Sequence, residues 1–390
     1  MTMTPLAHAH PTDLGLCPER TQRLMDVLRR EVASGRLPGA VAMVARRGKI
    51  GLFEAVGQQD PGTGTPMKTD SIFRIYSMTK PLVSVAVMML VERGQLLLSD
   101  LVSRWMPEYA NQQVATARGL EPVRQAATVQ DLLRHTAGLT YEFLGDSAVQ
   151  HQYGAVNIAS RERTNAEFSQ TLASLPLQFQ PGTVWAYSRA TDVLGRLVEV
   201  VSGQGLGAFL QTEILGPLGM VDTGFAVPPE QQHRIAEPFS HDPDGGVRRE
   251  MLEPRQVPAM EAGGGGLMST AMDYTRFLQC LRNRGELDGV RLLGPHTVDY
   301  MTADHLGGMP SDGTLLPPGH GFGLGFAVRT HLGLSPVPGS VGLYYWGGIA
   351  GTTFFVDPAL DLYAMLMVQA PNQRDYYRPL FRDLVYAALM

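Results

Sequence analysis

The residue pair with the clearest chemical potential is Ser77 and Lys80, which form an S-x-x-K motif. Residues three apart share one face of a helix, so the hydroxyl and the amine can meet. A serine hydroxyl needs a neighbouring base to act as a nucleophile. A lysine can be that base when burial disfavours its charged form. The apolar stretch that follows, Leu82 to Val91, predicts such burial. The motif therefore indicates nucleophilic catalysis by serine.

Other blocks follow this pair along the chain. Tyr187 comes after the turn Pro181–Gly182 and ahead of a helical stretch, which predicts a loop tyrosine able to point into a cleft. Trp346, Gly347 and Gly348 lie in a late strand, where glycine lets another backbone or a ligand approach closely. The block LRHTAGL at 133–139 is a further recognisable segment.

As a set, these motifs resemble the serine β-lactamase and penicillin-recognising superfamily, in which S-x-x-K is a signature. The resemblance is closest to class C β-lactamases and, nearer still, family VIII carboxylesterases, and it runs from about Leu37 to the C-terminus. It implies Ser77 as nucleophile, Lys80 as its proton acceptor and Tyr187 as the proton shuttle to the leaving group. It also implies an oxyanion hole made by the backbone N–H groups of Ser77 and Ile349. Two fixed N–H donors suit an acyl-transfer intermediate.

The chain departs from the class C pattern at two places. Arg189 stands where those enzymes usually have asparagine, and Trp346-Gly347-Gly348 stands where they have Lys-Thr-Gly. The missing lysine removes a cation that would hold a β-lactam carboxylate, although Arg189 offers a substitute. The resemblance to the W-x-G form of family VIII enzymes favours an esterase, with Trp346 as a flat apolar wall for an uncharged ester. We expect Trp346, Gly347, Gly348 and Arg189 to bind substrate.

Elements that could position these residues come from both ends of the chain. A helix over about 77–93, ending at Gly94, is apolar on nearly every side and is expected to be buried. Strands are expected at 39–45 and 50–56 as a hairpin and again at 321–330, 344–356 and 362–368, with a closing helix at 378–389. Helices are expected from Pro18 through Val32 and at 128–134 and 190–201.

This pattern predicts an α+β protein with the β-lactamase-like fold. Residues 1–94 and 286–390 would form an antiparallel sheet flanked by helices, and residues 95–285 a mostly helical domain, with the active site in the cleft between them. Two segments, 227–246 and 302–321, are rich in Pro, Gly, His and Asp and fit no regular element. Loops of that length are often binding loops, although solvated excursions are just as common.

Composition excludes several other classes. The 390 residues carry a formal net charge of −5 with no basic block, which argues against nucleic-acid and membrane-surface binding. The longest apolar run is about half of the ~20 residues that span a bilayer. The first fifteen residues lack the pattern of a secretory signal, so we expect a cytoplasmic protein. Two cysteines and the histidine spacings support no metal site, and no cofactor is implied.

Two alternatives remain beside a hydrolase of short-chain carboxylic esters. One is amide hydrolysis on the same fold, by a β-lactamase, a D-amino-acid peptidase or an oligoamide hydrolase. Another is a non-catalytic binding protein, against which the intact Ser77, Lys80 and Tyr187 argue. An α/β-hydrolase is excluded because no serine lies in G-x-S-x-G. We expect His135 to be a structural histidine at a helix end, and Gly263–Gly266 to be a turn or a close approach to the active-site helix.

Overall fold

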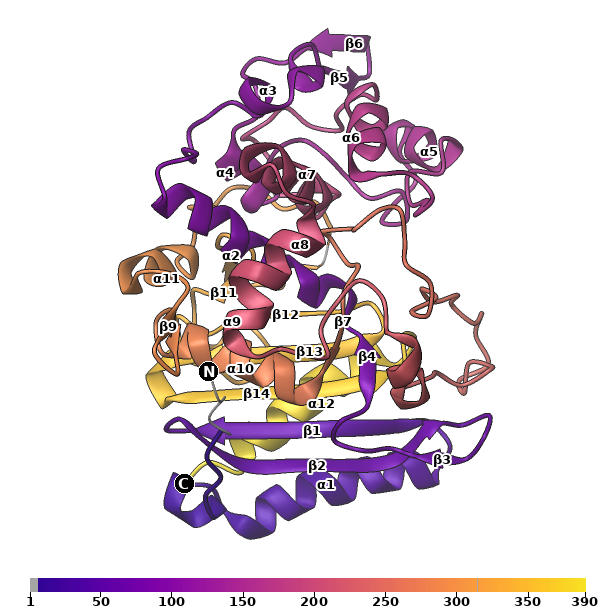
Figure 1. Cartoon of the computed structure of the whole chain (residues 1–390), viewed down its shortest axis with the longest axis vertical. Coiled ribbons are helices and arrows are strands. Elements are labelled where there is room, and N and C mark those ends of the chain that lie inside the picture. The colour runs from indigo at the N-terminus through magenta and orange to yellow at the C-terminus, as the bar shows by residue number, and fades with distance from the viewer. Residues whose placement is uncertain (1–5, 314) are drawn as a thin grey trace.

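A central antiparallel sheet, formed by strands from both ends of the chain, organises the fold (Figure 1). The structure is a computed structural model that describes residues 6–313 and 315–390. The first five residues of the segment examined for a secretory signal, and residue 314 of the segment 302–321, lie outside the described residues. The strands of the sheet, in spatial order, are β10 (His320–Phe322), β11 (Ala327–Arg329), β12 (Tyr344–Gly347), β13 (Gly351–Asp357), β14 (Leu362–Gln369), β1 (Gly39–Arg46), β2 (Lys49–Asp60) and β3 (Thr65–Pro66).

The predicted strands are present, with finer divisions than the sequence pattern indicated. The hairpin of β1 and β2 is confirmed, and β14 pairs antiparallel with β1, which joins the two ends of the chain. The apolar run 344–356 is two strands, β12 and β13, separated by a tight turn at Gly348–Gly351. The run 321–330 is likewise split into β10 and β11. These splits occur at glycines, which form the turns within an otherwise apolar pattern.

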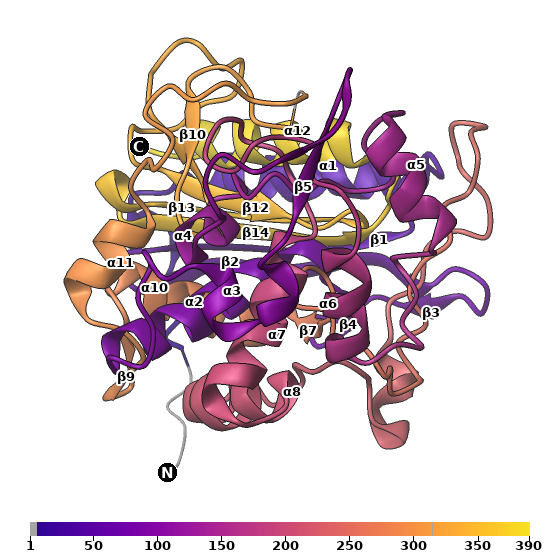
Figure 2. The ribbon, with the colours of Figure 1, turned by 90° about the horizontal axis from the view of Figure 1, so that it is seen from above.

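Helices cover both faces of the sheet, which explains why its central strands are apolar throughout. Figure 2 shows α1 (Pro18–Ala33) and α12 (Arg374–Ala387) on one side and α2 (Thr79–Glu92) and α10 (Ala271–Arg282) on the other. Successive side chains of a strand point to opposite faces. In β1, Ala42 packs with the α1 and α12 side chains, whereas Met43 packs with the side chains of α2.

Helix α2 is the buried helix expected over 77–93, but it begins at Thr79, and Ser77 lies in the 3-10 turn just before it. All residues from Thr79 to Leu90 are buried. Pro81 lies in its first turn, where proline costs no intrahelical hydrogen bond. Gly94 follows the helix with a φ of +68° and its N–H donates to the Val91 carbonyl, which confirms the expected end.

The remaining elements surround α2 and form most of the middle of the chain. The further helices are α3 (Val102–Trp105), α4 (Val129–Leu133), α5 (Ala148–Ala155), α6 (Asn165–Ala173), α7 (Ala190–Ser202), α8 (Leu206–Leu210), α9 (Gly216–Leu218) and α11 (Pro295–Met301). Short strand pairs are β4 (Ile72–Arg74) with β7 (Met268–Thr270), β5 (Gln113–Thr116) with β6 (Gly119–Pro122), and β8 (Glu286–Leu287) with β9 (Val290–Arg291).

Helix α10, which the sequence analysis assigned to the helical domain, contacts β14 of the sheet, and the Tyr363 hydroxyl donates to the Gln279 side chain. We therefore place the return to the sheet domain near β7 instead of at residue 286.

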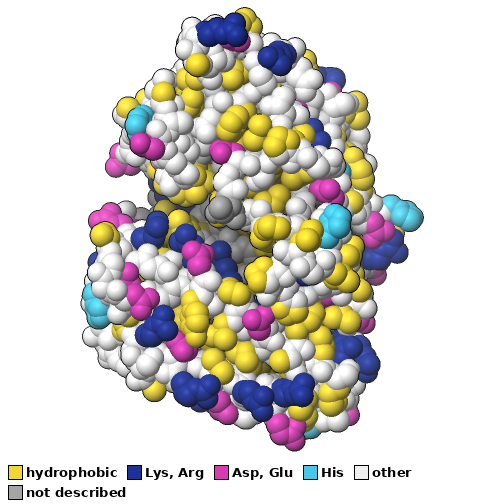
Figure 3. Space-filling model, turned by 180° about the vertical axis from the view of Figure 1, so that it is seen from behind, with side chains coloured by type: hydrophobic (Ala, Val, Ile, Leu, Met, Phe, Trp, Pro, Cys, Tyr) yellow, Lys and Arg dark blue, Asp and Glu magenta, His cyan; other side chains and the backbone are white. Residues whose placement is uncertain are grey.

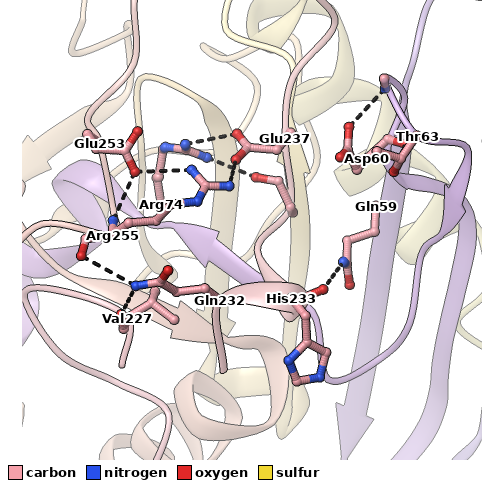
Figure 4. Close-up of polar contacts among 12 residues, drawn as sticks. Gln59, Asp60, Thr63, Arg74, Val227, Gln232, His233, Glu237, Glu253 and Arg255 are labelled. Atoms are coloured by element: carbon pink, nitrogen blue, oxygen red, sulfur yellow. Dashed lines mark hydrogen bonds and ion pairs between the residues drawn. The ribbon is translucent and has the colours of Figure 1, made fainter. Parts of the chain in front are cut away.

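The segment 227–246, which fitted no regular element, is fastened to β4 by a buried arginine (Figure 4). The guanidinium of Arg74 donates to the carbonyl oxygens of Leu252 (2.6 Å) and Ala236 (2.9 Å). It also forms an ion pair with Glu237 at 2.9 Å, and Arg255 pairs with the same carboxylate at 2.6 Å. This segment is therefore held close to the residues that precede Ser77.

On the face shown in Figure 3, basic and acidic side chains are interspersed over the lower half of the molecule.

Among the described residues, no single helix has the length and apolar character needed to cross a membrane, although the bent pair Ala190–Ser202 and Leu206–Leu218, which meet at 78°, passes the same test together.

Candidate active site

Ser77 lies in a short 3-10 turn (Tyr76–Met78) between β4 and α2, at the wall of a cavity of about 420 Å³. Tyr76 has a φ of +44°, an uncommon conformation for a residue with a side chain. Its hydroxyl accepts a hydrogen bond from the Leu252 N–H at 2.8 Å, and Arg74 donates to the carbonyl of the same Leu252. These two bonds hold the tyrosine against the backbone at Leu252. The strained turn therefore presents Ser77 to the cavity from a rigid support.

Lys80 lies one helical turn beyond Ser77 and is fully buried. Its Nζ is 3.2 Å from the Ser77 Oγ, 3.0 Å from the Tyr141 hydroxyl and 2.5 Å from the Gly264 carbonyl oxygen. Burial lowers the pKa of this amine to about 7, against the opposing attraction of the Asp192 carboxylate. A neutral amine has two protons for Tyr141 and Gly264 and one lone pair for the Ser77 proton. The geometry therefore suits a general base.

Two of these contacts involve residues to which the sequence analysis gave no such role. Tyr141 follows the block at 133–139 and lines the cavity, and its hydroxyl contacts the Lys80 amine. Gly264 belongs to the glycine run at 263–266, and its N–H donates to the Asp192 carboxylate at 2.8 Å. A Cβ on Gly264 would lie 2.8 Å from that carboxylate. The run is thus the close approach to the active-site helix that the sequence suggested, and it supplies an acceptor for Lys80.

Tyr187 lies in the loop before α7, as expected, and packs beside both catalytic candidates. The Lys80 Nζ is 4.6 Å from the centre of the tyrosine ring. Burial raises the pKa of the phenol, partly offset by its contacts with the Ser77 hydroxyl and the Trp346 indole. A phenol with a raised pKa keeps its proton at neutral pH, so Tyr187 is suited to pass a proton to a leaving group, whereas Lys80 is suited to remove one.

The Trp346 side chain does not form the apolar wall of the cavity that the sequence analysis expected. Its side chain is buried behind Tyr187, outside the residues that line the cavity, and its indole N–H donates to the Tyr187 hydroxyl at 3.1 Å. The reason is the packing of β12, which turns this side chain toward the rings of Tyr187 and Phe322. The indole is thus placed to orient the tyrosine hydroxyl, outside the lining of the cavity.

This placement predicts that Trp346→Phe lowers kcat/KM for an ester about tenfold, because the phenol oxygen loses a donor while the aromatic packing is kept. Trp185→Phe is the matched control. Trp185 also packs against Tyr187, but in the described chain its indole N–H has no hydrogen-bond partner. Equal losses in the two variants, measured at matched folded fractions, would show that the indole hydrogen bond has no role.

The proposed second oxyanion donor, the Ile349 N–H, lies in the turn between β12 and β13. It lines the same cavity as Ser77, and within the described residues this N–H donates to no acceptor in the protein. Gly348 and Gly347 do not line the cavity. Their role is close packing, since a Cβ on Gly348 would lie 2.4 Å from the Ile75 carbonyl oxygen. The partly buried Arg378 of α12 donates to the Gly348 carbonyl and so braces this turn.

Arg189 lines the cavity, but its charge is already paired. The guanidinium donates to both carboxylate oxygens of Glu142 and lies 3.5 Å from the Asp192 carboxylate. Its expected role as a substitute cation for a β-lactam carboxylate is therefore not supported by its surroundings. Glu142 is 47 positions away in the chain, and no sequence pattern connects the two residues.

His135 lies just after α4, is fully buried, and contacts the Tyr187 ring at 5.0 Å between centroids. Its Nδ1 is 3.1 Å from the Ser188 hydroxyl. Burial and the nearby Lys80 lower the pKa of this imidazole well below its usual value, so the ring is neutral. These contacts fit the expected structural role, since the ring supports the loop that carries Tyr187.

Comparisons with known proteins agree with this fold. The β-lactamase family matches residues 24–387. Esterase EstB of Burkholderia gladioli is 37% identical over 392 residues, covering 94% of this chain and 95% of the esterase. Two solved structures are also similar. EstCE1, a hydrolase with promiscuous acyltransferase activity, has a TM-score of 0.80 and 29% identity, covering 94% of this chain and 98% of that one. Simvastatin synthase (LovD) from Aspergillus terreus has a TM-score of 0.77 and 26% identity, with 94% and 98% coverage.

The match to the family extends over nearly the whole chain, and it includes the strands, the buried helix α2 and the cavity that holds Ser77. The expected superfamily and the expected α+β fold are both confirmed. The chain belongs to the β-lactamase family of serine hydrolases.

Proposed function

We propose that the protein hydrolyses carboxylic esters through an acyl-enzyme on Ser77. The observation that carries the proposal is the position of the Ser77 hydroxyl, 3.2 Å from a buried amine whose pKa is lowered to about 7, at the wall of a cavity. In the acylation step, Lys80 accepts the hydroxyl proton while Oγ forms a bond to the ester carbonyl carbon. The N–H groups of Ser77 and Ile349 stabilise the negative oxygen of the tetrahedral intermediate.

Collapse of this intermediate breaks the bond to the leaving alkoxide, which takes a proton from Tyr187. The alcohol then leaves, and Tyr187 takes up a replacement proton from the Lys80 ammonium. Water then attacks the acyl group, and the same groups act in the reverse order to release the acid and free Ser77. Water is the one co-reactant that these steps consume, and the protons pass between groups of the chain.

An ester is favoured over a β-lactam because strand β12 carries no cation. Trp346 stands at the position where class C β-lactamases have the lysine of Lys-Thr-Gly, here called the third-motif position, and its indole donates to the Tyr187 hydroxyl. The other candidate cation, Arg189, is paired with Glu142. The esterase name of the relative from Burkholderia gladioli supports the same substrate class. The cavity lies within the range of about 300 to 1,000 Å³ typical of small-molecule sites. It is therefore large enough for a short-chain ester.

The test compares 4-nitrophenyl butyrate with a chromogenic cephalosporin and with 4-nitrobutyranilide. A carboxylate that loses a charge-assisted bond forfeits about one to two decades of binding, so kcat/KM for the ester is expected to exceed that for the cephalosporin at least about tenfold. The anilide distinguishes an esterase from an amidase. Cleavage of the cephalosporin or the anilide as fast as the ester would overturn the esterase assignment.

Transfer of the acyl group to an alcohol is a second candidate reaction of the same acyl-enzyme. It is supported by the acyltransferase activity named for EstCE1. Adding 1-butanol to the butyrate assay and measuring butyl butyrate distinguishes the two reactions, because hydrolysis yields only butyrate.

A further inference from the structure

The cavity that holds Ser77 is lined by a further arginine, Arg161, whose charge no group in the described part of the chain pairs. Arg161 lies in the connection between α5 and α6, and its side chain is partly buried. Within residues 6–313 and 315–390, its guanidinium makes no hydrogen bond or ion pair. The other two arginines of the cavity differ, since Arg189 pairs with Glu142 and the exposed Arg249 donates to the Asn372 side chain at 3.1 Å.

Leaving a partly buried guanidinium without a partner is costly, because buried charges are normally paired. Burial lowers the pKa of Arg161, and the Asp192 carboxylate acts against that effect from a distance. Asp192 is itself engaged, since it accepts the Gly264 N–H and pairs with Arg189. The remaining acid of the cavity wall, Glu250, is exposed to solvent. No carboxylate of the described chain therefore satisfies Arg161.

The surroundings of Arg161 hold its side chain in place without pairing its charge. Its carbonyl oxygen accepts the N–H groups of Ala259 and Met260, both at 3.1 Å, which ties this connection to the segment leading into the glycine run. The guanidinium lies over Gly266, where a Cβ would be 2.7 Å from one of its terminal nitrogens. The glycine therefore leaves room for the cation beside the cavity, in a position set by the backbone.

We propose that Arg161 binds a carboxylate on the substrate, so that the preferred substrates are esters of a molecule carrying a second, free carboxylate. The inference rests on the proposed esterase function and deepens it. A guanidinium offers two parallel N–H donors that match a carboxylate, which suits it for this role. Arg161 belongs to the helical domain, whereas the third-motif position that holds a β-lactam carboxylate in related enzymes lies on β12. The subsite is thus a different one.

The free carboxylate can belong to the acyl part or to the alcohol part of the ester, and two matched pairs of substrates distinguish these sources. Monoethyl glutarate and ethyl pentanoate differ by a carboxylate at the end of the acyl chain. Butyryloxyacetate and ethyl butyrate differ by a carboxylate on the alcohol. For each pair, the ratio of kcat/KM for the anionic ester to that for the neutral ester is measured by product analysis in the wild type and the variants.

Arg161→Gln is expected to lower this ratio about ten- to hundredfold for one of the two pairs, because a charge-assisted bond is lost. Arg161→Lys is expected to recover part of it through a single charge, and it serves as the second variant if the glutamine variant does not fold. Arg249→Gln, which removes one positive charge from the exposed edge of the same cavity, controls for net charge and should change the ratio less than about threefold.

Ratios that stay within threefold of the wild type for both pairs in the folded Arg161 variants would overturn the proposal. An equal fall in Arg249→Gln would also overturn it, because the effect would then be one of overall charge. Failure of the esterase function is distinguishable from these results, since the wild type would then cleave none of the four esters.

Discussion

Ser77→Ala is expected to lower kcat/KM for 4-nitrophenyl butyrate at least about a thousandfold, to the level that the oxyanion donors and binding alone can support. The reason is that the variant has no oxygen to form the acyl-enzyme, while the base and the cavity stay in place. The fold is expected to survive, because the side chain lies at the wall of a cavity and loses little packing. Activity and thermal unfolding of the purified variant measure both.

Ser84→Ala is the matched control for this prediction. Ser84 lies on the same helix and is buried, but it faces the sheet domain near Gly325 instead of the cavity. The same chemical change at this position should leave most of the activity. A loss of less than tenfold in Ser77→Ala would remove Ser77 from the role of nucleophile.

Lys80→Met is expected to be nearly as damaging as the loss of Ser77, at about a thousandfold, because the hydroxyl then has no base. The methionine keeps much of the side-chain volume, so the core of α2 is preserved. Lys80→Arg should not restore activity, since a guanidinium does not lose its proton at usable pH. Lys68→Met, at an exposed lysine, is the control for removal of an amine. An active arginine variant would show that the site needs only a positive charge.

The wild-type pH profile tests the same base independently. The amine must be neutral to accept the serine proton, and its pKa is lowered to about 7. Below that pH the ammonium predominates, so kcat/KM should fall about tenfold per pH unit as pH decreases, and it should level off above pH 8. The opposite slope, or a flat profile from pH 5 to 9, would contradict a lysine base.

Local sequence patterns predicted the elements that hold the nucleophile. The S-x-x-K spacing and the apolar run after it placed Ser77 and Lys80 at the start of a buried helix, and α2 has those properties. Tyr187 and Ile349 were inferred from the resemblance to a family, and the structure places both beside Ser77. The roles proposed for these four residues are predictions that the experiments test.

The misplaced residues are those whose roles depend on contacts between distant segments. Whether Trp346 faces the cavity or Tyr187 depends on how β12 packs against a loop 159 positions earlier. The pairing of Arg189 with Glu142 and the contact of Gly264 with Lys80 likewise join separate parts of the helical domain and the glycine run. No spacing rule within one element connects such residues, so an arginine expected from the sequence to be free, Arg189, is paired in the structure. Arg161, about which the sequence made no prediction, has no partner among the described residues.

The most direct test of the account is to identify the acylated residue. The wild type is mixed with 4-nitrophenyl butyrate, quenched with acid within the first turnover, digested and examined by mass spectrometry. The account predicts one butyryl group on the peptide that contains Ser77, with fragment ions assigning it to that serine, and no butyryl group in Ser77→Ala. Turnover with an unmodified Ser77 peptide, or with the butyryl group on another residue such as Tyr187, would contradict it.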